Sequence, residues 1–316
     1  MNEIVPDFVD PAIDGPLAGR EEEWRLIIEY RARLAMEARQ WPEAERLQRV
    51  CVELDRKDAA PALAVPPEKL DGAQKNAIRT LATSLNQLAR VQRDQDNQEC
   101  ITNFETAISL FASIEDRTAS GHNAMNLGNA YLTVLRMRDL GKAESQFHRA
   151  FELYEPNDIK ARGAALGQLR CVSYERFKEA RAAKQSEQEL LRHLNDAARF
   201  YLQMLELLPP NAVGDLAVAH GSLGNIYNDA GDLHRALSRW RESIRYFESE
   251  GNLHSAAQAR RNVAVALARA GRLADAREYA LAALRNYETF GDRAAKEIEE
   301  TKGLIEAIKK AEGGKQ

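Results

Sequence analysis

The stretch AVAHGSLGNIYNDAGDLHRALSRWRESIRYFESE, residues 217–250, decides the fold. It contains two apolar stripes at helical spacing, separated by a turn at Gly231. The first stripe carries Gly224 near its centre, and in the second stripe Ala236 precedes Trp240 by one helical turn. Two antiparallel helices approach closely only where one of them presents little side-chain bulk at the crossing. The stretch therefore predicts a tightly packed helix hairpin.

The same pattern returns along the chain at a nearly fixed interval. An apolar residue is followed by a small one in Leu88-Ala89, Leu127-Gly128, Leu166-Gly167, Leu223-Gly224 and Val263-Ala264, at intervals of 39, 39, 57 and 40 residues. Three of these four intervals agree within one residue, which is the signature of a repeat architecture. One hairpin cannot bury both of its faces, so successive hairpins must stack on one another.

This pattern resembles the tetratricopeptide repeat (TPR) family. Residues 217–250 carry Leu223, Gly224, Tyr227, Gly231, Ala236 and Trp240 at the spacing of that family. Residues 121–156 and 257–290 match less completely, and residues 82–116 are more degenerate. The interval of 39–40 residues is similar to the long repeats of kinesin light chains and of many bacterial regulatory arrays. The resemblance implies an all-α fold, a right-handed α-solenoid of stacked antiparallel helix hairpins (a TPR superhelix).

The sequence predicts five segments. These are an extended acidic N-terminal segment (1–20), an N-terminal helix pair that is a divergent repeat or a cap (21–56), a Pro/Ala-rich loop (57–75), an array of five repeats (76–291), and a C-terminal capping helix and tail (292–316). The third repeat, 160–208, is elongated, because its interval exceeds 39 by 18 residues. This central hairpin should project from the array.

The tip region of the central hairpin is locally basic. We place Tyr174, Arg176, Phe177, Lys178, Arg181 and Lys184 near this tip. Two interpretations stay open for it. The hairpin is either a solvated extension or a docking site for an effector domain.

Charge and composition exclude several classes of partner. The 316 residues include 44 basic and 48 acidic side chains, for a formal net charge of -4. A nucleic-acid-binding protein carries a clear basic excess, so the charge balance argues against a nucleic-acid partner. No apolar run approaches the roughly 20 residues that span a bilayer, so we expect no membrane insertion.

The cysteines and the first residues bear on localisation. Cys51, Cys100 and Cys171 are far apart and odd in number, which indicates free thiols in a reducing compartment. The first twenty residues are acidic and interrupted by prolines, unlike a signal peptide. We therefore expect a cytoplasmic protein.

A search for catalytic chemistry finds none. No two of the six histidines stand at metal-ligand spacing, and the sequence contains no phosphate-binding glycine loop or nucleophile elbow. The sequence thus predicts a protein that is not an enzyme and that uses no cofactor or metal.

The resemblance implies that the first helix of each repeat lines a concave groove. The predicted peptide-binding residues in that groove are Asn86, Arg90, Asn126, Asn129, Asn225, Asn228, Arg261, Asn262 and Lys302. Asparagine is a mediocre helix former, so its recurrence on one face of the first helices needs an explanation. Its amide offers both a donor and an acceptor, which matches an extended peptide backbone. The alternative is that these amides are solvated or bond between neighbouring helices.

Asn225, Asn262 and Lys302 also match three positions of the carboxylate-clamp pattern, which chaperone-binding members of the family use for a terminal carboxylate. Gly221 and Ile298 stand where that pattern has lysine, so the match is partial.

Two functions are consistent with these features. The first is a non-enzymatic protein- or peptide-binding module that acts as a scaffold or adaptor through its concave groove. The second is a sensor or regulatory arm of a bacterial signalling or defence system, which controls a partner effector such as a protease or an ATPase.

Overall fold

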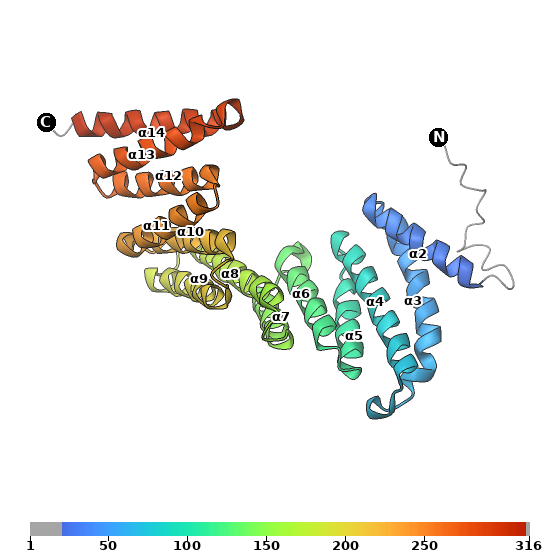
Figure 1. The fold of residues 1–316 in the computed structure, drawn as a ribbon. Helices are drawn as coiled ribbons and strands as arrows, with labels where there is room; N and C mark the ends of the chain where they lie inside the picture. Colours follow the sequence, from blue (N-terminus) through green and yellow to red (C-terminus); the bar gives the residue numbers. More distant parts are fainter. Residues whose placement is uncertain (1–20, 314–316) are drawn as a thin grey trace, which may run out of the picture. The chain divides into compact units, whose positions relative to one another are not determined.

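The computed structural model describes residues 21–313, and these form helices joined by turns (Figure 1). The described residues contain 13 α-helices and no β-strand. Each helix packs mainly against its neighbours in chain order. The prediction of an all-α solenoid of stacked antiparallel hairpins is confirmed. The acidic segment expected at 1–20 lies outside the described residues, as do residues 314–316 of the C-terminal tail.

The chain forms two compact units that divide between Ala165 and Leu166. Unit 1 contains α2 (Glu21–Glu37), α3 (Trp41–Leu63), the 3-10 turn η1 (Pro67–Lys69), α4 (Gly72–Asp94), α5 (Glu99–Ser113), α6 (Arg117–Thr133), the 3-10 turn η2 (Leu135–Met137) and α7 (Leu140–Leu153). The division falls within α8 (Ile159–Ala182). Unit 2 continues with α9 (Glu187–Leu207), α10 (Val213–Asp229), α11 (Leu233–Ser249), α12 (Leu253–Arg269), α13 (Leu273–Glu288), the 3-10 turn η3 (Gly291–Ala294) and α14 (Ala295–Gly313).

The small residues of the repeat sit where two helices of a hairpin cross. A Cβ atom built on Gly128 would lie 2.6 Å from Cε1 of Phe147, and one built on Gly224 would overlap the Trp240 ring. In the elongated hairpin, by contrast, a Cβ on Gly167 would lie 3.9 Å from the nearest atom, which is an ordinary contact. Close helix approach therefore requires glycine at two of the three positions.

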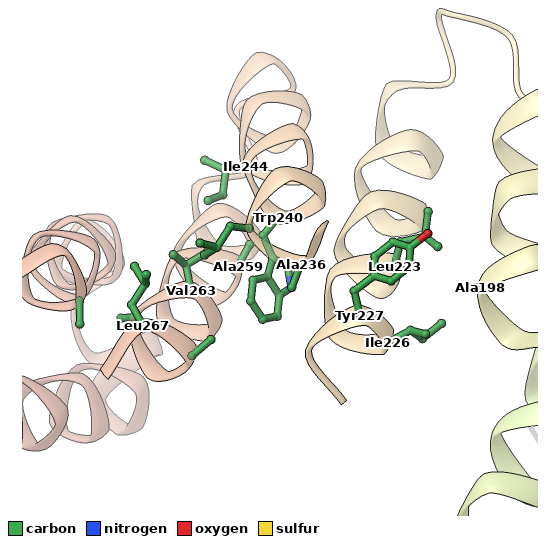
Figure 2. Close-up of a cluster of buried hydrophobic side chains, with 14 of the residues drawn as sticks. Ala198, Leu223, Ile226, Tyr227, Ala236, Trp240, Ile244, Ala259, Val263 and Leu267 are labelled. Atoms are coloured by element: carbon green, nitrogen blue, oxygen red, sulfur yellow. The ribbon is translucent and has the colours of Figure 1, made fainter. Parts of the chain in front are cut away.

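Trp240 is the largest fully buried side chain of unit 2, with 2% of its surface exposed. Figure 2 shows its ring between the helix that carries Leu223 and Tyr227 and the helix that carries Val263 and Leu267. One aromatic residue thus joins α10, α11 and α12. This packing fixes how the faces of α10 and α12 lie beside each other.

The tight turn inside each hairpin follows from local chemistry. Gly231 has φ +78°, a left-handed conformation that glycine adopts without strain. The next residue, Asp232, caps α11 because its side chain accepts a hydrogen bond from the backbone N–H of Arg235 at 2.9 Å. Helix α10 therefore ends and α11 begins at the Gly231 turn that the repeat pattern predicts.

The Pro/Ala-rich loop is shorter than we expected at 57–75. Helix α3 continues to Leu63 even though it contains Pro61, and α4 begins at Gly72. Ala59 and Ala62 are buried in the core against α4, so the apolar face of α3 continues through the segment. Pro61 lies in the last turn of the helix, so the missing hydrogen bond from its nitrogen leaves the preceding turns intact.

The central hairpin is elongated, but its aromatic residues do not form an exposed tip. Helices α8 and α9 have 24 and 21 residues, whereas α10 to α13 have 16 or 17. Phe177 is 4% exposed and belongs to the core of unit 2, and Tyr174 faces α10. Both residues lie in the last three turns of α8, near its end at Ala182, and Phe177 is buried there in the core.

A polar network holds α3, α4 and α5 together in unit 1. Gln92 has no exposed surface, and its amide nitrogen donates to Glu45 Oε1 at 3.2 Å and to Glu99 Oε2 at 2.9 Å. The Asn103 amide donates to Gln92 Oε1 at 2.7 Å. Arg49 and Gln95 donate to the two oxygens of Glu45, each at 2.7 Å. Each of the three helices thus contributes a carboxylate or an amide to one network.

This network predicts a pH dependence of stability. Burial alone raises the pKa of Glu45, but hydrogen bonds from Gln92, Arg49 and Gln95 outweigh it, so the pKa lies below the ordinary value of 4.5. A depressed pKa contributes stability that is present above pH 4.5 and is lost as the pH falls through the folded-state value. We expect Glu45→Gln to be less stable than the native chain at pH 7 in urea unfolding. The difference between the two chains should shrink as the pH falls below 4.5, and a difference that stays constant would contradict this prediction.

Candidate functional site

Unit 2 contains a pocket of about 380 Å³. It is lined by Tyr174 of α8, by Asn225, Asn228 and Asp229 of α10, by Trp240 of α11, and by Arg261, Asn262, Val265, Ala266 and Arg269 of α12. Helices α10 and α12 are the first helices of two successive hairpins, so their equivalent faces lie side by side. Four of the nine predicted residues, Asn225, Asn228, Arg261 and Asn262, therefore meet in one place.

The two central asparagines form an oriented pair. Trp240 Nε1 donates a hydrogen bond to Asn225 Oδ1 at 3.0 Å, and Asn262 Nδ2 donates to the same oxygen at 3.3 Å. Both bonds fix which end of the Asn225 amide is the oxygen. The NH₂ group of Asn225 and the carbonyl oxygen of Asn262 stay available. We call these two residues the amide pair of unit 2.

The charged groups around the pocket differ in their partners. Arg261 forms an ion pair with Glu300 of α14 at 2.8 Å, so its charge is already balanced. Arg269 is exposed and lies near Asp229, where its charge opposes the effect of burial on the pKa of that carboxyl. Tyr174 donates to Asp229 Oδ2 at 3.4 Å, and burial raises the pKa of both groups. The pocket thus combines the Arg269 guanidinium and the Asp229 carboxylate with amide and hydroxyl groups.

Unit 1 contains a second pair of the same kind. Asn126 Nδ2 of α6 donates to Asn86 Oδ1 of α4 at 3.0 Å. Arg90 lies one turn further along α4 and donates to Gln87 Oε1 at 3.3 Å. Arg90 and Gln87 line a different pocket of about 520 Å³, between α2, α3 and α4, while Asn129 is half-buried on α6. The predicted amides of unit 1 therefore bond partly to each other across helices.

Lys302 does not join the other predicted residues. It is exposed on α14 and does not line the pocket of the amide pair. The three positions that match the carboxylate-clamp pattern are thus not gathered in one pocket. Three charged or hydroxyl side chains at the pocket, Tyr174, Asp229 and Arg269, were absent from our prediction of site residues. Arg269 follows Asn262 by seven residues on the same helical face, a signal present in the sequence, whereas the position of Tyr174 depends on tertiary packing.

No three His, Cys, Asp or Glu side chains within the described part of the chain are placed to hold a metal ion. Among the helices of residues 21–313, none combines the length and the apolar character needed to cross a bilayer.

Comparison with known proteins identifies tetratricopeptide repeats in part of the chain. The tetratricopeptide repeat family model matches residues 215–289, which correspond to α10 through α13. No curated protein matches the chain.

Solved structures resemble this chain at low sequence identity. Aspartyl phosphate phosphatase F from Bacillus subtilis is 16% identical with a TM-score of 0.51, and the match covers 95% of this chain and 84% of that one. A signal transduction ATPase with a tetratricopeptide repeat sensor from Pyrococcus horikoshii is 16% identical with a TM-score of 0.48, over 92% of this chain and 44% of that one. Kinesin light chain-type repeats from Podosopora anserina are 15% identical with a TM-score of 0.44, over 68% and 98%.

Proposed function

Because the chain is a tetratricopeptide-repeat solenoid, a fold of protein-interaction modules, we propose that it binds an extended segment of a partner protein at the pocket of unit 2. In this role it is a non-enzymatic scaffold or adaptor. The amide pair is the observation that carries the proposal.

The amide pair matches the two hydrogen-bonding groups of a peptide unit. The free NH₂ of Asn225 donates to a backbone carbonyl, and the free carbonyl of Asn262 accepts from a backbone N–H. Trp240 holds Asn225 in this orientation before any ligand arrives, so little ordering is required on binding. Exposed Arg269 lines the same pocket and can pair with an acidic side chain next to the bound peptide unit.

The test is a peptide selection followed by substitution. Peptides are selected by phage display on the native chain, and their dissociation constants are measured by isothermal titration calorimetry. We expect Asn262→Ala to weaken binding about tenfold or more, which corresponds to about 1.4 kcal/mol. Asn195→Ala is the matched control, because Asn195 is an exposed helical asparagine of α9 outside the pocket. Peptides that bind Asn262→Ala and the native chain equally would reject the pocket as the site.

The sensor or regulatory arm, and effector docking on the 160–208 hairpin, stay predictions of the sequence. Small-angle X-ray scattering with and without a selected peptide tests them, since a switch requires the radius of gyration to change on binding.

A further inference from the structure

Unit 1 contains a pocket of about 520 Å³ that is built from the same kinds of helix as the pocket of the amide pair. It is lined by both helices of one hairpin, α2 and α3, and by the first helix of the next hairpin, α4. The pocket of unit 2 likewise combines α10, α11 and α12. We call the cavity in unit 1 the α2–α4 pocket. The repeat thus places different side chains around two pockets of similar construction.

A buried amide lines the α2–α4 pocket. Gln48 of α3 is 7% exposed, and its Nε2 donates to the Met36 sulfur at 3.6 Å, a weak acceptor. Its carbonyl oxygen accepts no hydrogen bond within residues 21–313. Ser84 also lines the pocket, but its hydroxyl already donates to Asp55 at 2.5 Å. Because buried polar groups in proteins almost always have a partner, the Gln48 carbonyl is suited to accept an N–H or O–H from a ligand.

Apolar and neutral side chains form much of the remaining lining. Val91 of α4 is fully buried, and Met36 and Trp41 are half-buried. Cys51 also lines the pocket, and burial raises the pKa of its thiol to about 12, so the thiol is neutral. A methionine sulfur and an indole ring both make favourable contacts with an aromatic ring. This lining therefore favours an aromatic side chain.

The charges around the α2–α4 pocket nearly cancel. Its lining includes two guanidinium groups and three carboxylates, those of Arg33, Arg90, Glu29, Glu37 and Asp94. Arg33 lies 4.0 Å from Glu37, and Arg93 donates to Asp94 at 2.7 Å. A charged group of a ligand would compete with these pairs and would gain little at an exposed rim. The pocket therefore favours a neutral side chain.

We propose that the α2–α4 pocket binds a tyrosine or tryptophan side chain of a partner protein. The ring packs against Met36 and Trp41, and its O–H or N–H donates to the carbonyl oxygen of Gln48. Phenylalanine also supplies a ring but leaves that oxygen without a donor, so it should bind more weakly. That the ligand belongs to a protein rests on the function proposed above, whereas the preference for an aromatic donor rests on this pocket alone.

Methyl NMR on the full chain tests the pocket. The chain has five methionines, and of the four within residues 21–313 only Met36 lines the pocket, so its labelled methyl group reports binding there. The probe is N-acetyl-tryptophan amide, and N-acetyl-phenylalanine amide is the matched compound without a ring donor. We expect the Met36 signal to shift with both and the tryptophan compound to bind about fivefold more tightly, the effect of one hydrogen bond.

Gln48→Leu separates the hydrogen bond from the apolar contacts. Leucine keeps a similar volume and removes the carbonyl, so the two compounds should bind this variant alike. Asn262→Ala alters the pocket of unit 2 and should leave the Met36 response unchanged, so the two sites are tested separately.

The comparison of the two compounds on the native chain depends on no variant. A Met36 signal that moves with neither compound at about 10 mM, where a ligand with a millimolar dissociation constant is mostly bound, overturns the proposal. Equal affinity of the native chain for both compounds overturns the role of Gln48.

Discussion

Gly224→Ala is expected to lower the free energy of unfolding of unit 2 by about 3 kcal/mol. The added methyl group overlaps the ring of Trp240, which is 2% exposed and packed between three helices, so the ring cannot move aside. Alanine is otherwise the better helix former, by roughly 0.5–1 kcal/mol. The steric overlap therefore decides the sign. Urea unfolding followed by Trp240 fluorescence, in a background with Trp24 and Trp41 changed to Phe, measures the effect in unit 2.

Two other glycines serve as controls for Gly224→Ala. Gly167 is also a repeat landmark, but a Cβ there meets its nearest atom at 3.9 Å. Gly303 lies in α14, and a Cβ there has no atom within 4 Å. Gly167→Ala and Gly303→Ala should each be neutral or slightly stabilising. Equal losses of stability for Gly224→Ala and Gly167→Ala would show that removal of glycine itself, and not contact with Trp240, causes the destabilisation.

The helix hairpins were predictable from sequence because their determinants are local. The small residue, the glycine turn and the aromatic residue of each hairpin lie within one stretch such as residues 217–250, and each acts on its own neighbours. The extent of α3 was not predictable in this way. Pro61 and the surrounding alanines read as a loop by composition, but burial of Ala59 and Ala62 against α4 keeps the segment helical. Burial by a later helix is not visible in the segment itself.

The candidate site was predictable only in part, for a related reason. Helical spacing places Asn225 and Asn262 on equivalent faces of successive hairpins, and this predicts that they lie close together. The bond from Trp240 that orients Asn225 joins residues on two helices, and no periodicity specifies it. Spacing likewise placed Tyr174 toward the end of the first long helix of the central hairpin but did not reveal that its hydroxyl bonds to Asp229 of α10. Positions along one helix are readable from sequence, but contacts between helices depend on their packing.

The polar network of unit 1 also depends on contacts between helices, here made by polar side chains. A glutamine in the last turn of α4 is expected on the surface, since glutamine is usually exposed. Gln92 nevertheless has no exposed surface, because Glu45, Glu99 and Asn103 come from two other helices to satisfy its amide. A buried polar network is stabilising only while every member is satisfied. The loss of its central residue should therefore have a large effect.

Gln92→Leu is expected to lower the free energy of unfolding of unit 1 by about 3 kcal/mol. Leucine has a similar volume, so the change removes hydrogen bonds with little loss of packing. Two carboxylates and one amide lose a partner, and hydrogen bonds to charged groups contribute the most. Gln95→Leu is the graded control, because Gln95 is only half-buried and donates a single bond, to Glu45. Urea unfolding monitored by circular dichroism gives the stability, and amide hydrogen exchange in α3 to α5 locates the loss. If Gln92→Leu lowered the free energy of unfolding no more than Gln95→Leu, the network would not be what holds these three helices together.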